Sequence, residues 1–126
     1  MFNDNKNLID KPEIECDVID YTTHIIVNFR INDIAKHKTF INALNKQLEL
    51  HKRYLGVVPH VKIGINYFDI YDLKIYDDYA IFEFYVLKSI LKSEYDFVYD
   101  VITNRKIHLF YHIYDEKLIT TYLLYD

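Results

Sequence analysis

Several residue types are scarce in this chain of 126 residues, and each scarcity excludes a class of protein. The single cysteine, Cys16, cannot form an internal disulfide or build a Cys/His zinc site. The two glycines, Gly56 and Gly64, are too few for a P-loop or a dinucleotide-binding fingerprint. Only three arginines are present and the net charge is −4, so the basic stripe typical of nucleic-acid binding is missing. We therefore do not expect nucleic acid as the main ligand.

Long apolar runs are also missing, since no stretch approaches the ~20 apolar residues of a membrane-spanning helix. The first residues are polar and lack the apolar segment of a signal peptide, so we expect a cytoplasmic protein without a membrane partner. Residues 1–12 are predicted to form a polar tail and residues 13–126 a single domain. The apolar content of 51% is sufficient for a hydrophobic core.

The composition also says something about the gene. Residues with AT-rich codons, such as Phe, Tyr, Ile, Asn and Lys, far outnumber residues with GC-rich codons, such as Gly, Ala, Arg and Pro. This bias indicates an AT-rich genome, such as a low-GC bacterium, its phage or a virus of a similar host. Part of the excess of tyrosine and isoleucine can therefore reflect mutation, which is the alternative to any functional reading of an aromatic patch.

The first half of the chain predicts a hairpin followed by a helix. Residues 14–20 and 24–31 are strand-like, and the second segment alternates cleanly between apolar and other residues. Asn32-Asp33 can cap a helix start and Gly56 can end it, so the helix is predicted at about 33–55. Its apolar stripe has helical spacing and consists of Ile34, Ile41, Leu44, Leu48 and Leu55.

The second half predicts three strands, a helix and a final hairpin. Asp77-Asp78 forms a turn between two aromatic, β-branched runs, and Ser93 to Asp96 resembles a capping box. The expected elements are strands at 61–67, 70–76 and 79–86, a helix within 88–103, and strands at 106–114 and 118–125. The order ββ-α-βββ-α-ββ predicts an α+β fold, an antiparallel sheet built from hairpins with two helices packed on one face.

Candidate catalytic residues are few. Cys16 lies between two acidic residues that disfavour a thiolate, and neither Ser89 nor Ser93 has the flanking glycines of a nucleophile elbow. His108 and His112 share a strand face but are some 13 Å apart by the ~3.3 Å rise per residue, which is too far for one metal ion. We therefore expect no catalytic residue, no metal and no cofactor.

One short motif keeps an enzymatic alternative open. Asp72-Leu73-Lys74, within an expected α-βββ-α-β order, resembles the D-x-K half of the PD-(D/E)xK nuclease motif. That resemblance implies Mg²⁺ held by two carboxylates and a water positioned by the lysine. The chain departs from the family because the motif is on the second expected strand instead of the third. The upstream carboxylate would also have to be Asp69, only three residues earlier.

The most distinctive feature is a recurrent Tyr-Asp pair. Tyrosine is enriched in protein interfaces, and a neighbouring aspartate adds attraction to a basic partner. The alternative is that these codons are common in an AT-rich gene and that the rings half-pack at sheet edges. The pairs begin at Tyr71, Tyr76, Tyr95, Tyr99, Tyr114 and Tyr125. The residues predicted to bind a partner are Tyr71, Asp72, Tyr76, Asp77, Asp78, Tyr114, Asp115 and Glu116.

These observations favour a small, non-enzymatic binding protein of a phage, virus or mobile element. Such a protein would act stoichiometrically on a host protein with a basic surface, for example as an inhibitor of a CRISPR-type defence system. A bacterial immunity protein that neutralises a toxin is the alternative, and a nuclease is a third. We also expect a homodimer through free sheet edges, because the terminal strand 118–125 carries little charge to protect it.

Overall fold

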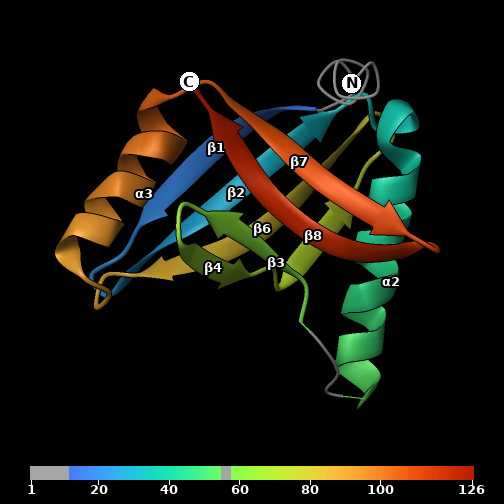
Figure 1. Ribbon diagram of the computed structural model, residues 1–126, viewed down its shortest axis with the longest axis horizontal. Helices are drawn as coiled ribbons and strands as arrows, with labels where there is room; N and C mark the ends of the chain where they lie inside the picture. Colours follow the sequence, from blue (N-terminus) through green and yellow to red (C-terminus); the bar gives the residue numbers. More distant parts are fainter. Residues whose placement is uncertain (1–11, 55–57) are drawn as a thin grey trace.

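The computed structural model describes residues 12–54 and 58–126 (Figure 1). Most of the predicted tail, Gly56 and the predicted end of the first helix therefore lie outside the described residues. The strands are β1 (Glu13–Asp20), β2 (His24–Asn32), β3 (His60–Ile63), β4 (Asn66–Asp69), β5 (Asp72–Ile75), β6 (Tyr79–Leu87), β7 (Ile107–Tyr114) and β8 (Lys117–Tyr125). The helices are the 3₁₀ turn η1 (Ile34–His37), α2 (Lys38–Tyr54) and α3 (Lys92–Asn104). None of the described helices is long and apolar enough to cross a membrane.

The central strands follow the predicted alternation. β2 pairs antiparallel with β1 on one side and with β6 along its whole length on the other. Every second side chain of β2 and β6 is buried, which creates the inner face of the sheet. The fully buried residues of these two strands are Ile25, Val27, Phe29, Ile31, Ala80, Phe82, Phe84 and Val86.

The sheet is mixed, so the prediction of a purely antiparallel sheet is wrong. Its eight strands have the order β4-β3-β8-β7-β1-β2-β6-β5. β3 runs parallel to β8 and pairs with it at Lys62 and Tyr122, while the other pairs are antiparallel. Both β1 and β8 have a strand on either side, so neither is an edge of the sheet. The expected dimer contact through the terminal strand therefore loses its structural basis, because β3 occupies that position.

Four strands, and not three, separate the two α-helices. The predicted strand 61–67 is interrupted at Gly64 and Ile65, which form the turn between β3 and β4. Gly64 has φ +63°, a left-handed conformation that glycine adopts without steric cost. An antiparallel hairpin results, in which Ile63 pairs with Asn66. The alternation of apolar residues continues through this turn, which explains why the pattern predicts a single strand.

The sheet curls so that its terminal strand β4 contacts β6, the neighbour of the other terminal strand. β4 and β5 are the two terminal strands of the order, yet only Ile70 and Tyr71 separate them in the chain. The backbone N–H of Tyr71 donates to the carbonyl of Glu83 at 3.1 Å, which ties this connection to β6. The ring of Phe68 on β4 stacks on the ring of Phe84 on β6, with centroids 5.4 Å apart. We call the meeting line of β4 and β6 the seam.

The helices begin by mechanisms different from those predicted. Asp33 precedes η1 as expected, but it has φ 55° and its side chain makes no capping hydrogen bond. Its carbonyl instead accepts from the N–H of Lys36 at 3.1 Å. The capping box at Ser93 is wrong, because α3 begins at Lys92 and its capping residue is Leu91, which has no side-chain cap. In Figure 1 α3 lies at the left of the sheet and α2 at the right, where β7 and β8 contact it.

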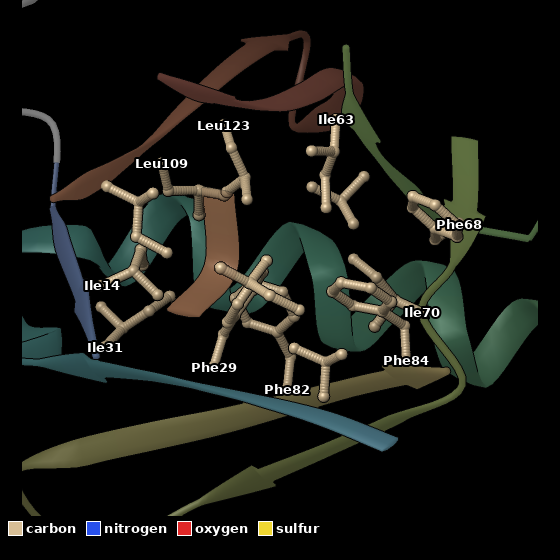
Figure 2. Close-up of a cluster of buried hydrophobic side chains, with 14 of the residues drawn as sticks. Ile14, Phe29, Ile31, Ile63, Phe68, Ile70, Phe82, Phe84, Leu109 and Leu123 are labelled. Atoms are coloured by element: carbon tan, nitrogen blue, oxygen red, sulfur yellow. The ribbon is translucent and has the colours of Figure 1, made fainter. Parts of the chain in front are cut away.

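One hydrophobic core joins all these elements. Figure 2 shows side chains from β1, β2, β3, β4, β6, β7 and β8 pointing toward one another inside the curl. Both α-helices contribute to the same cluster, α2 with Phe40, Ile41, Leu44 and Leu48, and α3 with Val98, Val101 and Ile102. Aromatic rings fill the centre, where Phe29 contacts the rings of Phe82 and Phe84 edge-on, both at 5.2 Å between centroids. The side chains of the inner face are therefore buried in the core, so a binding surface has to be formed by residues outside that face.

Candidate binding surface

The residues predicted to bind a partner fall into two groups. Five of them occupy the edge strand β5 and its two ends: Tyr71, Asp72, Tyr76, Asp77 and Asp78. The other three, Tyr114, Asp115 and Glu116, form the tip of the β7–β8 hairpin. Asp115 and Glu116 both have positive φ, at 52° and 62°, as a tight two-residue hairpin turn requires. Three strands separate β7 from β5 in the sheet, so the two groups do not form one continuous surface.

A row of exposed rings begins at Tyr71 and crosses the outer face of the sheet. Tyr71 contacts Tyr85 of β6 with ring centroids 5.6 Å apart. Tyr85 contacts His24 of β2 at 5.9 Å, and His24 stacks on Tyr21 at 5.1 Å. The three tyrosines are 41–47% exposed, although Tyr85 and His24 belong to central strands. Both α-helices contribute apolar side chains to the core, and the second half of α2 lies beside this row at Tyr71 and Tyr85.

Two hollows flank this row at the seam. One has a volume of about 250 Å³ and lies between β4, the end of β6 and the residues before α3, with Tyr67, Leu87 and Ile90 in its lining. The other has a volume of about 190 Å³ and lies between the seam and the second half of α2. Asp69 and Tyr85 line both hollows. We call Tyr21, His24, Tyr67, Asp69, Tyr71, Tyr85 and Leu87 the seam surface.

At the seam, backbone N–H and C=O groups near the end of β6 point away from β2. The N–H of Tyr76 donates to the carbonyl of Tyr79 at 2.8 Å, which fixes the alternation along β6. Odd-numbered residues of β6 up to Glu83 accordingly direct their backbone N–H and C=O groups toward β5. Beyond Glu83 there is no β5 residue opposite β6, so the same groups of Tyr85 point toward β4. β4 contacts β6 there without forming a ladder with it. The backbone N–H and C=O of Tyr85 therefore face the hollow beside the exposed rings.

Acidic residues border the seam surface, while His51 and Lys52 line its second hollow and Lys62 lies over the ring of Tyr67. The strand register places Asp17, Asn28, Glu83 and Asp72 in one row across four strands of the outer face. Among the ion pairs between described residues, none involves Asp17, Asp69 or Glu83. Burial raises the pKa of Tyr71 to about 12, and its hydrogen bond to Glu83 and the nearby carboxylates act in the same direction. Tyr71 therefore stays neutral at physiological pH and presents a hydroxyl beside unneutralised carboxylates.

The position of the nuclease-like motif in the fold agrees with the nuclease family in one respect and differs from it in others. Because β3 and β4 are two strands, Asp72-Leu73-Lys74 lies on the third strand after α2, which removes one of the departures from the nuclease family. However, β5 is an edge strand, and four strands instead of three precede α3. The Lys74 ammonium lies 4.0 Å from the Asp72 carboxylate. Within residues 12–54 and 58–126, no group of three or more His, Cys, Asp or Glu side chains could hold a metal ion.

The remaining candidates lie at separate places in the fold. Burial raises the pKa of the Cys16 thiol to about 12, with Asp17 adding to the effect, so the thiolate is scarce at neutral pH. His108 is half-buried and His112 exposed on the face opposite the buried Leu109, which confirms the predicted alternation of β7. His37 is buried at 8% exposure, and its Nδ1 lies 3.2 Å from the hydroxyl of Tyr111.

The sequence pattern does not single out Tyr85, Leu87, Tyr21 or His24 as binding residues. Their alternation places Tyr85 on the outer face, but it gives no sign that His24 and Tyr21 lie next to it. That neighbourhood depends on the register between β2 and β6, in which His24 is opposite Leu87. No protein-family model matches the chain, and comparisons with curated proteins and with solved structures find no significant similarity.

Proposed function

We propose that this chain is a non-enzymatic protein-binding module that docks a basic host protein on the seam surface. The supporting observation is the continuous row of half-exposed rings from Tyr21 to Tyr71, which runs beside two hollows on the outer face of the sheet. Tyrosine provides a large rigid contact area and a polar tip, and it is enriched among residues that dominate binding energy. The biological form of this proposal is a stoichiometric inhibitor, made by a phage, virus or mobile element, that acts on a defence protein in the host cytoplasm.

Charge and shape both favour a partner with a basic, protruding element. An apolar side chain of the partner can enter the larger hollow beside Tyr67 and Leu87. A lysine or arginine of the partner can then reach Asp69, which borders both hollows and has no ion pair among the described residues. Carboxylates near an interface increase the rate of association and select for opposite charge. The outward backbone groups of Tyr85 can add hydrogen bonds to the partner's main chain.

The test compares variants of matched exposure in a quantitative pull-down. Tyr85→Ala removes the centre of the row, while the control Tyr99→Ala removes a ring of 39% exposure on α3 that stacks on Tyr95 at 5.9 Å. The tagged proteins are incubated with lysate of the gene's own organism or of its host. We expect one near-stoichiometric partner to be retained by the wild type and by Tyr99→Ala. For Tyr85→Ala, Kd should rise about thirtyfold, as expected for a hot-spot loss of ~2 kcal/mol.

The identity of the captured partner tests the biological role, and the binding of the variants tests the location of the interface. A captured defence protein supports the inhibitor form, whereas a captured toxin supports the immunity form of the same binding mode. If Tyr85→Ala retains the partner at wild-type affinity, the seam surface is not the binding site. If Tyr114→Ala then loses the partner, the binding site is the tip of the β7–β8 hairpin. Asp69→Asn should weaken binding less as the salt concentration rises, because the screened charge then contributes less.

A further inference from the structure

The free edge of β5 points to self-association of this protein. β5 is the last strand of the sheet order and pairs only with β6 among the described strands. The hydrogen bond from Tyr76 to Tyr79 fixes the alternation, so Leu73 and Ile75 direct their backbone N–H and C=O groups away from β6. Such groups are a template for another strand. Ile75 is 49% exposed at this edge, and Leu73 is half-buried against the core.

The charges of β5 are complementary to those of a second copy in only one register. Short edges with a lysine usually resist pairing, because like charges would meet. In an antiparallel pair centred on Leu73, however, Asp72 of each copy lies opposite Lys74 of the other, on the outer face of both sheets. Centring the pair on Lys74 would instead place the two lysines opposite each other, which is unfavourable.

We propose that two copies of the chain pair antiparallel along β5, centred on Leu73, to form a homodimer with a continuous sheet. The twofold axis of such a pair is perpendicular to the sheet, so both outer faces point the same way. Two seam surfaces would then be displayed side by side, which allows a bivalent partner to bind with increased avidity. The contact is short, because β5 contains only four residues. The dimer is therefore expected to be weak and to form at high protein concentration.

A charge exchange tests this register. Lys74→Asp brings two carboxylates opposite each other at both ends of the contact, and Asp72→Lys brings two ammonium groups together in the same way. Each variant alone is expected to associate at least about tenfold more weakly than the wild type, because like charges directly opposite in antiparallel strands are unfavourable. Mixed in equal amounts, the two variants should form a heterodimer, since every acidic position then faces a basic one. Lys106→Asp, the same charge change at an exposed site outside β5, is the control.

Sedimentation equilibrium at low salt gives the result directly. The wild type and the control should shift from 15.3 kDa toward twice that mass as the concentration approaches about 1 mM. A wild type that stays monomeric throughout this range would overturn the proposal. Unchanged association of Lys74→Asp, or failure of the two folded variants to associate on mixing, would also overturn it. None of these outcomes depends on a host partner, so the dimer and the binding function can fail separately.

Discussion

The turn between β3 and β4 offers a sharp test of the fold, because Gly64 there combines two constraints. Its φ of +63° lies in the left-handed region that residues with a Cβ rarely adopt. A Cβ built at this position would lie 2.6 Å from Cε2 of the Phe97 ring on α3. Gly64→Ala must therefore strain the turn and also displace a ring that packs against the core.

The expected cost follows from these two contributions. The left-handed conformation costs an alanine about 1–2 kcal/mol, and a ring forced about 30° from its rotamer costs about 0.5–1.5 kcal/mol. We therefore expect Gly64→Ala to lower the free energy of unfolding by about 1.5–3.5 kcal/mol, the sum of the backbone and the ring contributions. A domain of typical stability would remain folded with this loss.

Urea denaturation of four proteins separates the contributions. They are the wild type, Gly64→Ala, Phe97→Leu and the double variant. Leucine lacks the Cε2 and Cζ atoms that approach Gly64, so in the Phe97→Leu background the alanine should cost only the backbone contribution of about 1–2 kcal/mol. An equal cost in both backgrounds would show that the ring does not restrict this position. A cost below about 0.5 kcal/mol in the wild-type background, which is the usual effect of a surface substitution, would refute the turn geometry itself.

Two further predictions concern groups with shifted pKa values. The pKa of Tyr71 is about 12 in the folded chain against an ordinary value of 10.0, so the fold favours the neutral phenol. The neutral Tyr71 side chain therefore contributes fully to the free energy of unfolding below pH 10, and this contribution is lost as the pH rises through about 12. The difference in absorbance at 295 nm between the wild type and Tyr71→Phe should accordingly show no ionisation of this ring at about pH 10.5. The Cys16 thiol, with its pKa raised to about 12, should react with a disulfide reagent at about pH 8 at least about tenfold more slowly in the folded than in the urea-unfolded protein. Equal rates would show that Cys16 is accessible.

Local structure could largely be predicted from the sequence. The alternation in residues 24–31 and 79–86 is strong because one face of each strand is completely buried. The helical stripe with Ile41, Leu44 and Leu48 is equally clear, since these side chains enter the core from α2. Asp77-Asp78 follows the end of β5 as predicted, because short acidic side chains favour turns over strands. In each of these cases the pattern depends on neighbours within a few residues.

The errors arise where distant segments decide the outcome. The β3–β4 turn is hidden because Ile65, at its tip, is 74% exposed yet continues an apolar alternation. The parallel pair of β3 and β8 joins Lys62 to Tyr122, far apart in the chain, so no local signal can indicate it. The seam surface depends in the same way on the register of β2 with β6 and on the contact of β4 with β6. Tyr71 stands out in the sequence because it belongs to a repeated dipeptide, whereas Tyr85 belongs to none.

The closure of the sheet explains why exposed rings gather at the seam. Two residues, Ile70 and Tyr71, join β4 to β5, and β4 pairs with β3 instead of continuing the β5 ladder along β6 beyond Glu83. The end of β6 is then left with outward backbone groups and with Tyr85 and Leu87 about half exposed. A single exposed ring, such as Tyr114 on its hairpin tip, is ordinary for a protein surface. Contiguous rings beside unpaired strand positions are a liability for solubility, and a partner that covers them removes this liability.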